Sequence, residues 1–379
     1  MSLLRLGIIG RSAKENEHRL PIHPDHLARI EPDVAARITL EQGYGEKFGR
    51  SDADLAPLVG DLASREEIIE QSDVVLLLKP QHEDVAALRE GQTLWGWPHC
   101  VQDTELTQLA IDRGLTLIAF EAMNHWTRDD TVGLHVFHKN NELAGYCSVL
   151  HALQLVGATG DYGRRLTAAV IGFGATARGA VTALSAQGIH DVAVLTTRGV
   201  AAVASPIHSV RIVHFDHDPD GGPSHAITSR GRVPLAPFLA ERDIVVNCTL
   251  QDPAAPLIYL LTRDLESFRP GSLIVDVSCD EGMGFDWARP TTFDEPMFDV
   301  GDHVHYYGVD HTPSYLWNSA TWDISEALIP FLRPVLEGAE AWEMDETLSR
   351  AIEIQDGRVK NTAILDFQHR SEEYPYPLS

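Results

Sequence analysis

The chain has 379 residues, of which 44% are hydrophobic, and its 55 acidic and 30 basic side chains give a formal net charge of −25. This length and composition are sufficient for two domains, each with its own core. Such a negative charge would repel the phosphate backbone of nucleic acids and an anionic membrane surface, so neither is expected as a partner.

Cysteine and hydropathy patterns indicate a cytoplasmic protein. Cys100, Cys147, Cys248 and Cys279 are widely separated and include no C-x-x-C pair, which argues against a disulfide framework and a structural zinc site. The histidines match no standard metal motif, so no metal is expected. No stretch approaches the roughly 18 apolar residues that span a bilayer, and the N-terminal apolar run is too short for a signal peptide. The oligomeric state stays open, with a homo-oligomer as one possibility.

Short apolar runs alternate with helical patterns over the first 130 residues, which predicts an α/β layer. The expected strands are residues 6–9, 38–40, 74–78, 93–96 and 115–120. Apolar residues then recur at helical spacing over 141–155, with Gly157 shortly after the end. We expect this segment to be a connecting helix.

The middle of the chain has the pattern of a βαβ unit: a strand at 166–171, a glycine-rich turn, a helix at 175–187 and a strand at 191–196. Further apolar β runs follow at 211–214, 244–249, 273–277 and 304–309. Together they predict an open parallel sheet of at least five strands.

A helix at 324–336 and a strand-turn-strand at 351–360 come after this sheet. We therefore expect an α/β protein with two Rossmann-like domains. The central dinucleotide-binding domain, residues 141–311, is inserted in a discontinuous outer substrate domain made of residues 1–140 and 312–379.

The turn after the first strand of the central domain fits G-x-G-x-x-[GA] with Gly172, Gly174 and Ala177. The first glycine permits a tight turn, the second lets the backbone approach a pyrophosphate, and the alanine lets the helix pack close to the strand. The N–H groups of the helix N-terminus are then available to phosphate. A merely structural glycine turn is the alternative.

The end of the second strand bears on the choice of cofactor. NAD-specific sites usually place Asp or Glu about 20 residues beyond the glycines, but this chain has Thr196, Thr197 and Arg198. Two hydroxyls and a guanidinium can bind a 2′-phosphate. NADP(H) is therefore preferred, and NAD(H) is retained as an alternative in which Arg198 is an ordinary exposed loop residue.

Motifs along nearly the whole chain resemble the superfamily of alanine dehydrogenase, transhydrogenase and saccharopine dehydrogenase. In chain order the segments that carry the resemblance are Glu15-Asn16-Glu17-His18-Arg19-Leu20-Pro21-Ile22-His23-Pro24, Leu78-Lys79-Pro80, Trp97-Pro98-His99-Cys100, residues 275–282, Arg289-Pro290-Thr291-Thr292 and Val309-Asp310-His311-Thr312-Pro313-Ser314.

The segment 310–314 looks more like the branch of saccharopine dehydrogenase and N5-(carboxyethyl)ornithine synthase than like alanine dehydrogenase. That resemblance implies an opine-like reaction, in which a basic amino acid (ornithine or lysine) condenses with a 2-oxo acid (pyruvate or 2-oxoglutarate) and NAD(P)H reduces the imine. The aromatic segment Tyr315-Leu316-Trp317 replaces a basic residue expected in saccharopine dehydrogenases, which favours a smaller acid such as pyruvate.

The chemistry of individual side chains suggests which residues would catalyse this reaction. A histidine with a pKa near 6.5 can both give and take a proton at neutral pH, which makes His99 a candidate acid–base. Lys79 ends a buried strand, where α/β sheets place ligand groups, and could act as its partner or as a carboxylate anchor. Arg19 offers a planar fork for a substrate carboxylate.

Two carboxylates complete the predicted set. Asp280 follows the strand at 273–277 and matches the aspartate that is catalytic in the alanine dehydrogenase branch. Glu121 matches an acidic position in saccharopine dehydrogenases and would hold the cationic side-chain amine of the substrate.

Plainer interpretations are also open: His99 as a loop residue, Lys79 as a solvated strand end and Arg19 as an ion-pair partner. For the chain as a whole the alternatives are reductive amination with ammonia, as in alanine dehydrogenase, and a dinucleotide-binding sensor without turnover. The segment 215–220, rich in Asp and His, matches no standard metal site and is expected to be a solvated loop.

Overall fold

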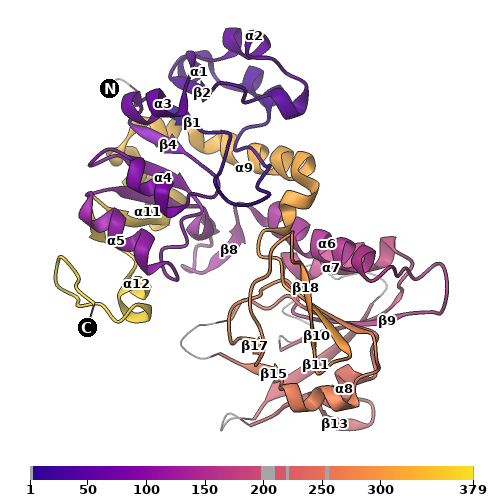
Figure 1. Ribbon diagram of the computed structural model, residues 1–379. Coiled ribbons are helices and arrows are strands. Elements are labelled where there is room, and N and C mark those ends of the chain that lie inside the picture. The colour runs from indigo at the N-terminus through magenta and orange to yellow at the C-terminus, as the bar shows by residue number, and fades with distance from the viewer. Residues whose placement is uncertain (1–2, 198–209, 219–221, 252–255, 379) are drawn as a thin grey trace. The chain divides into compact units, whose positions relative to one another are not determined.

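The chain folds into two compact units (Figure 1) in a computed structural model that describes residues 3–197, 210–218, 222–251 and 256–378. Unit 1 comprises residues 1–138 and 317–379, and unit 2 comprises residues 139–316. The sequence-predicted division lies at 140/141 and 311/312. The second boundary differs because the 3-10 helix Thr312–Leu316 groups with unit 2.

The sheet of unit 1 has the strand order β21-β20-β6-β5-β4-β1-β2-β3. Its strands are β1 Leu6–Ile8, β2 Ile38–Glu41, β3 Asp61–Ala63, β4 Val74–Leu76, β5 Thr93–Gly96, β6 Thr116–Ala119, β20 Ile352–Gln355 and β21 Arg358–Val359. Strands β1 to β6 are parallel in the order 3-2-1-4-5-6, which is that of a Rossmann fold. Strand β20, from the end of the chain, pairs antiparallel with β6.

Helices cover both faces of this sheet, and the side chains of β1 and β4 alternate between the two faces. On one face Leu6, Ile8 and Leu76 pack with α1 (Pro32–Ala35), α9 (Trp317–Glu337), α10 (Ala339–Met344) and α11 (Glu346–Ala351). On the other face Val75 and Leu77 pack with α3 (Arg65–Gln71), α4 (His82–Ala87), α5 (Thr104–Asp112) and α12 (Thr362–Phe367). The C-terminal segment thus completes the core of the N-terminal segment.

The sheet of unit 2 has the order β13-β12-β11-β10-β9-β14-β16-β19-β18. Its strands are β9 Thr167–Ile171, β10 Asp191–Thr196, β11 Arg211–His217, β12 Ser224–Thr228, β13 Gly231–Pro234, β14 Ile244–Asn247, β16 Ser272–Asp276, β18 Met297–Val300 and β19 Val304–Tyr307. Its central six strands are parallel in the same 3-2-1-4-5-6 order. Both sheets therefore have Rossmann topology, as predicted.

Helices α6 (His138–Leu155) and α7 (Ala175–Ala186) cover one face of this sheet, and α8 (Leu235–Ala240) covers the other. Glycine allows α6 and α7 to pack closely. A Cβ at Gly179 would lie 1.7 Å from the Glu142 carbonyl oxygen, and one at Gly145 would lie 1.9 Å from that of Thr176. The two backbones touch at positions where no other residue fits.

The sequence missed several edge elements, because their apolar alternation is short or absent. These are β3, α2 (Asp52–Leu55), β12, β13, β18 and two small sheets, formed by β7 (Asn124–Trp126) with β8 (Val132–His135) and by β15 (Ile258–Leu260) with β17 (Gly284–Phe285). Helix α6 begins three residues before the predicted start. Among the described residues, no helix is both long and apolar enough to cross a bilayer.

Candidate active site

Lys79 and His99 meet at the carboxyl edge of the sheet of unit 1. Lys79 follows β4, His99 follows β5, and the two strand ends stay together because the amide of Trp97 donates to the Leu78 carbonyl at 2.9 Å. The Lys79 Nζ lies 2.8 Å from the His99 Nε2. His99 has a φ of +51°, a conformation that costs a non-glycine residue about 1–3 kcal/mol and is found mostly at functional sites.

The contacts of His99 define its orientation. An ammonium has only protons to give, so Lys79 donates to Nε2 and the proton of a neutral imidazole lies on Nδ1. That atom is 3.7 Å from the Oε1 of Glu121, which also accepts from the His99 backbone amide at 2.6 Å. A proton-bearing lysine, a proton-accepting nitrogen and a carboxyl group thus form a row.

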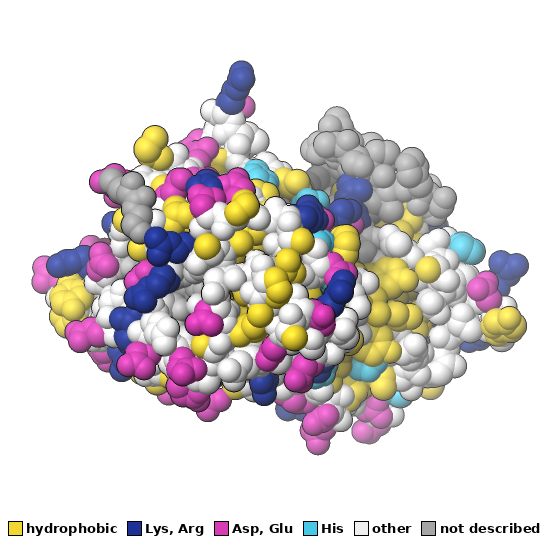
Figure 2. All heavy atoms as spheres, turned by 90° about the horizontal axis from the view of Figure 1, so that it is seen from above, with side chains coloured by type: hydrophobic (Ala, Val, Ile, Leu, Met, Phe, Trp, Pro, Cys, Tyr) yellow, Lys and Arg dark blue, Asp and Glu magenta, His cyan; other side chains and the backbone are white. Residues whose placement is uncertain are grey.

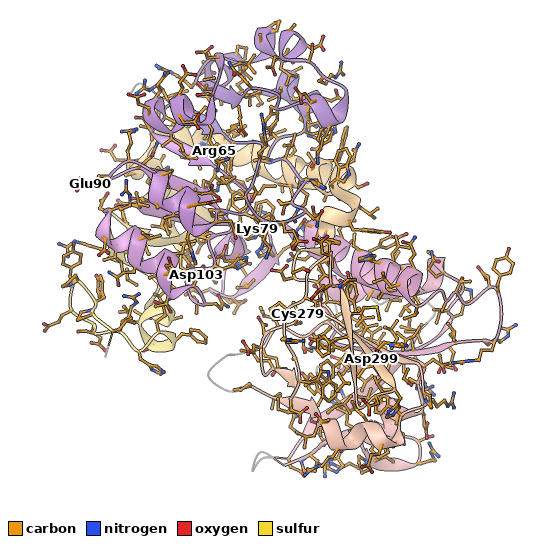
Figure 3. The ribbon with its side chains drawn as sticks, viewed as in Figure 1. Arg65, Lys79, Glu90, Asp103, Cys279 and Asp299 are labelled. Atoms are coloured by element: carbon orange, nitrogen blue, oxygen red, sulfur yellow. The ribbon has the colours of Figure 1, made fainter. Side chains whose placement is uncertain are left out.

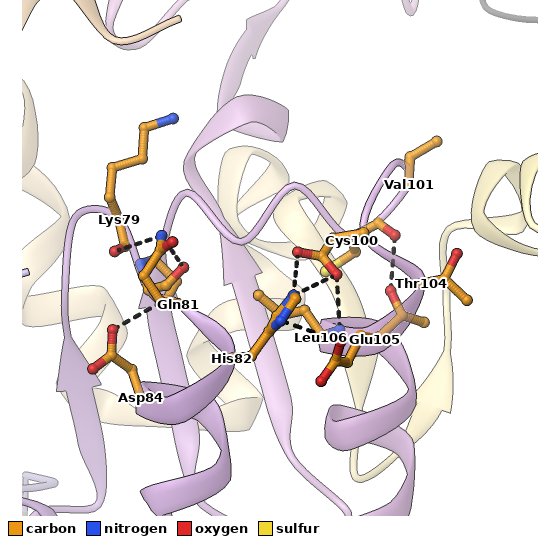
Figure 4. Close-up of polar contacts among 12 residues, drawn as sticks. Lys79, Gln81, His82, Asp84, Cys100, Val101, Thr104, Glu105 and Leu106 are labelled. Atoms are coloured by element: carbon orange, nitrogen blue, oxygen red, sulfur yellow. Dashed lines mark hydrogen bonds and ion pairs between the residues drawn. The ribbon is translucent and has the colours of Figure 1, made fainter. Parts of the chain in front are cut away.

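Hydrogen bonds from Ser12 and Gln81 hold the backbone carbonyls of Lys79 and Pro80. Ser12 Oγ donates to the Lys79 carbonyl at 2.6 Å, and the side-chain amide of Gln81 donates to the Pro80 carbonyl at 3.1 Å. Figure 4 shows the Lys79 side chain extending away from Gln81 and Asp84. Figure 3 labels Lys79 and Asp103, both in unit 1. The Oδ2 atom of Asp103 lies 2.8 Å from the Nε2 atom of His82.

Two carboxyl groups lie behind His99, that of Glu121 half-buried and that of Glu353 buried. Glu121, in the 3-10 helix Phe120–Ala122 after β6, interacts with Glu353 of the neighbouring strand β20. Burial, together with the charge of Glu353, raises the pKa of Glu121 to about 8. The Oε2 atom of each carboxyl is buried without a hydrogen-bond partner in the described structure. Because two adjacent, largely buried carboxyl groups repel each other when both are charged, the pair retains a shared proton to higher pH than a free carboxyl would.

Arg19 is buried and its fork is occupied by a neighbour. Its Nε lies 2.8 Å from Glu17 Oε1 and its Nη2 lies 2.5 Å from Glu17 Oε2, while its guanidinium lies 5.5 Å from the centre of the Trp97 ring. The structure thus places Arg19 next to the motif that carries His99, already paired with a carboxylate. A substrate carboxylate would have to share it with Glu17.

In unit 2 the glycine turn has the geometry that a dinucleotide site requires. Gly172 has a φ of +115°, and a Cβ there would lie 2.9 Å from the Cys248 carbonyl oxygen. Gly174 is the N-cap of α7, no side chain caps that terminus, and a Cβ at Gly174 would meet nothing within 4 Å. Ala177 is fully buried against the sheet. The open space above Gly174 and the uncapped amides fit a pyrophosphate.

The two threonines predicted for the cofactor stand beside this turn. The Gly172 amide donates to the Leu195 carbonyl at 2.9 Å, which brings the turn to the end of β10, where Thr196 is buried and Thr197 is exposed. Arg198 lies outside the described residues.

The ends of β14 and β16 carry a further polar cluster. Asp276 is fully buried and accepts from Asn247 at 2.9 Å, from the Cys279 amide at 3.0 Å and from the Tyr306 hydroxyl at 3.0 Å. Burial raises its pKa to about 7. The cluster fixes the turn that carries Asp280, in which Cys279 has a φ of +42°. Burial also raises the pKa of Asp280.

The prediction of a solvated loop at 215–220 is wrong for its first half, because β11 continues through His217 and Phe215 is buried in the core. Asp216 and Asp218 both pair with Arg232 of β13, and Asp220 lies outside the described residues. Among the residues that the structure describes, no group of three His, Cys, Asp or Glu side chains could hold a metal ion.

Family models match both parts of the chain. The N-terminal domain of alanine dehydrogenase/PNT matches residues 8–144, and the C-terminal domain of the same family matches residues 166–362. The chain belongs to the alanine dehydrogenase/PNT family. It is an oxidoreductase of that family, and the superfamily resemblance of its motifs is confirmed.

Individual relatives cover nearly all of the chain at low identity. An alanine dehydrogenase of Halomonas elongata is 27% identical over 94% of this chain and 95% of its own. An N5-(carboxyethyl)ornithine synthase of Clostridium botulinum is 26% identical over 82% and 89%. A solved L-alanine dehydrogenase matches with a TM-score of 0.76 at 19% identity, covering 96% of this chain and 99% of its own. The last likeness establishes the fold.

The structure thus brings Lys79, His99 and Glu121 into one row in unit 1, with Arg19 near Trp97 in the same unit. It places the glycine turn and Asp280 at strand ends of unit 2. Glu353 was missed, because an isolated acidic residue in a short C-terminal strand carries no motif. Asp276 lies within the motif at 275–282, and its place at the end of an apolar strand is the signal that could have identified it.

Proposed function

We propose that this enzyme reductively condenses a basic amino acid, such as ornithine or lysine, with a small 2-oxo acid through an imine, using NAD(P)H. The observation that carries the proposal is the contact of Lys79 with His99, whose backbone amide donates to the carboxyl group of Glu121. Imine formation needs one group that takes a proton from the amine and another that gives a proton to the departing hydroxide.

Each residue has a role in this scheme. Once Lys79 donates to the substrate instead of to His99, the Nε2 atom of His99 accepts the amine proton and returns it to the hydroxyl that leaves as water. Lys79 donates to the oxygen of the 2-oxo acid and holds its carboxylate, together with Arg19, whose guanidinium the substrate would share with Glu17. Glu121 is the partner of the substrate amine, and Asp280 orients the amine or a water molecule at the dinucleotide.

The dinucleotide, when bound, supplies the hydride that reduces the imine. Gly172, Gly174 and Ala177 would hold its pyrophosphate at the N-terminus of α7, and Thr196, Thr197 and Arg198 would hold the 2′-phosphate of NADP(H). Arg198→Ala should weaken NADPH by about 1.5–3 kcal/mol, the value of a charge-assisted hydrogen bond, and NADH much less. Equal loss for both nucleotides, measured by fluorescence titration, would remove Arg198 from the phosphate site.

Reductive amination with free ammonia is the second candidate, because several relatives of similar identity are named alanine dehydrogenases. The segment 310–314 argues against it. A dinucleotide sensor without turnover is disfavoured, since such a protein has no need for an acid–base row.

The deciding experiment is an NADPH-oxidation screen of the purified protein. It crosses pyruvate, glyoxylate, oxaloacetate and 2-oxoglutarate with ammonia, ornithine, lysine and arginine. We expect turnover with pyruvate and a diamino acid, and a secondary-amine product by mass spectrometry. Turnover with ammonia alone would establish the second candidate instead.

A further inference from the structure

A hollow of about 370 Å³ opens at the carboxyl ends of β1 and β2 in unit 1. The loop after β1 and the 3-10 helix Glu46–Phe48 line it. Small-molecule sites in proteins have volumes of about 300–1,000 Å³ and occur at this edge of open α/β sheets. The hollow is therefore large enough, and correctly placed, for part of a substrate.

The hollow adjoins the residues assigned to the chemistry. Ser12 lines it and donates to the Lys79 carbonyl at 2.6 Å. Glu17 also lines it and forms the fork with Arg19. Two lining residues are thus bonded directly to candidate substrate-binding residues, one to the Lys79 backbone and one to the Arg19 guanidinium.

The lining carries both signs of charge. Arg11, Lys14 and Lys47 supply three cations, and Lys47 Nζ is oriented by His18 Nδ1 at 2.6 Å. Arg11 also pairs with Glu41 of the same lining, with 3.7 Å between its Nε and the Glu41 Oε1.

Carboxylates and an apolar floor complete the lining. Glu17 and Glu46 are acidic residues of the hollow, while Glu41 is held by the backbone amides of Gly10 and Arg11 at 2.9 and 3.0 Å. The apolar floor is made by Leu20, Tyr44 and Phe48. A second carboxylate of an oxo acid would need cations alone, whereas a zwitterion needs cations and carboxylates side by side.

We propose that this hollow binds the zwitterionic α-amino and α-carboxylate head of the amino-acid substrate. The side chain of that amino acid then extends toward Lys79 and His99, where its terminal amine reacts. This assignment rests on the proposed function and adds the determinant that selects an α-amino acid over a simple amine.

The test compares two amines that react through the same terminal group: ornithine, which has the head, and propylamine, which lacks it. The variants are Lys47→Met, for the carboxylate contact, and Glu46→Gln, for the ammonium contact. The matched control is Lys360→Met, an exposed lysine of unit 1 outside the hollow. Thermal unfolding checks that all three variants are folded.

We expect the ratio of kcat/KM for ornithine over propylamine to fall about tenfold or more in the two hollow variants, because a charge-assisted contact is lost. The loss should lie in the KM for ornithine, and Lys360→Met should keep the wild-type ratio. An unchanged ratio in both hollow variants overturns the assignment. If the wild type uses ammonia but no diamino acid, the proposed function itself fails, and this is seen before any variant is made.

Discussion

At the scale of single residues, the pair of carboxyl groups behind His99 affects the pH dependence of the enzyme. Glu121 faces His99 and Lys79 on one side and Glu353 on the other. The thiol of Cys100 contacts Glu353. The backbone carbonyl of Glu121 contacts the His135 ring at 3.2 Å. Burial and the charge of Glu353 raise the pKa of Glu121. When the Glu121–Glu353 pair loses its shared proton, a further negative charge appears next to the acid–base pair.

Replacing Glu353 by Gln should therefore change the pH profile. Removing the charge of Glu353 lowers the pKa of Glu121, so the limb of the kcat/KM profile near pH 8 should move to lower pH by roughly one unit. The measurement is kcat/KM from pH 6 to 10. Glu340→Gln, at an exposed position of α10, is the control and should leave the limb in place. A lower rate with an unmoved limb would show that Glu353 acts only on packing.

Two glycines of unit 2 differ in what packs against them: Gly174, the N-cap of α7, and Gly179, within α7. Gly179 of α7 lies against the backbone of α6, whereas the position of a Cβ at Gly174 is open. Alanine is favoured over glycine by about 1 kcal/mol within a helix, but overpacking against backbone atoms costs about 1–3 kcal/mol. The steric term should dominate at Gly179.

Gly179→Ala should therefore lower the melting temperature and leave the dinucleotide affinity per folded molecule unchanged. Gly174→Ala should not lower the melting temperature but should weaken NADPH binding by roughly tenfold or more. The reason is that its methyl group occupies the space proposed for the pyrophosphate. Thermal unfolding and nucleotide titration of both variants are the measurements. Wild-type affinity in Gly174→Ala would contradict the placement of the pyrophosphate.

The parallel strands determine where the candidate functional side chains lie in both units. Lys79 and His99 follow adjacent strands of one sheet, and Asn247 and Asp276 end adjacent strands of the other. Because each parallel strand ends at the same edge, side chains that are 20 to 30 positions apart become neighbours. This relation was predictable from the strand pattern alone.

At the scale of the whole molecule the excess of acidic side chains sets the response to salt. Figure 2 shows acidic side chains spread over one face with basic ones between them, and the formal charge is −25. Repulsion among exposed charges is screened within about 10 Å at 0.1 M salt. Raising NaCl from 10 to 200 mM should therefore raise the melting temperature at pH 7.5, and a fall would indicate that surface ion pairs outweigh the repulsion.

The sequence by itself determined the α/β class, the two Rossmann sheets and the glycine turn, because these depend on local periodicity and on residues close together in the chain. It also placed Lys79 and His99 at strand ends. Tertiary structure alone decided that Glu353 reaches Glu121, since β20 pairs with β6 across more than 200 residues. It decided equally that Arg19 is held by Glu17 in a buried fork. Burial and pairing of charges depend on which segments pack together, and no local pattern records that.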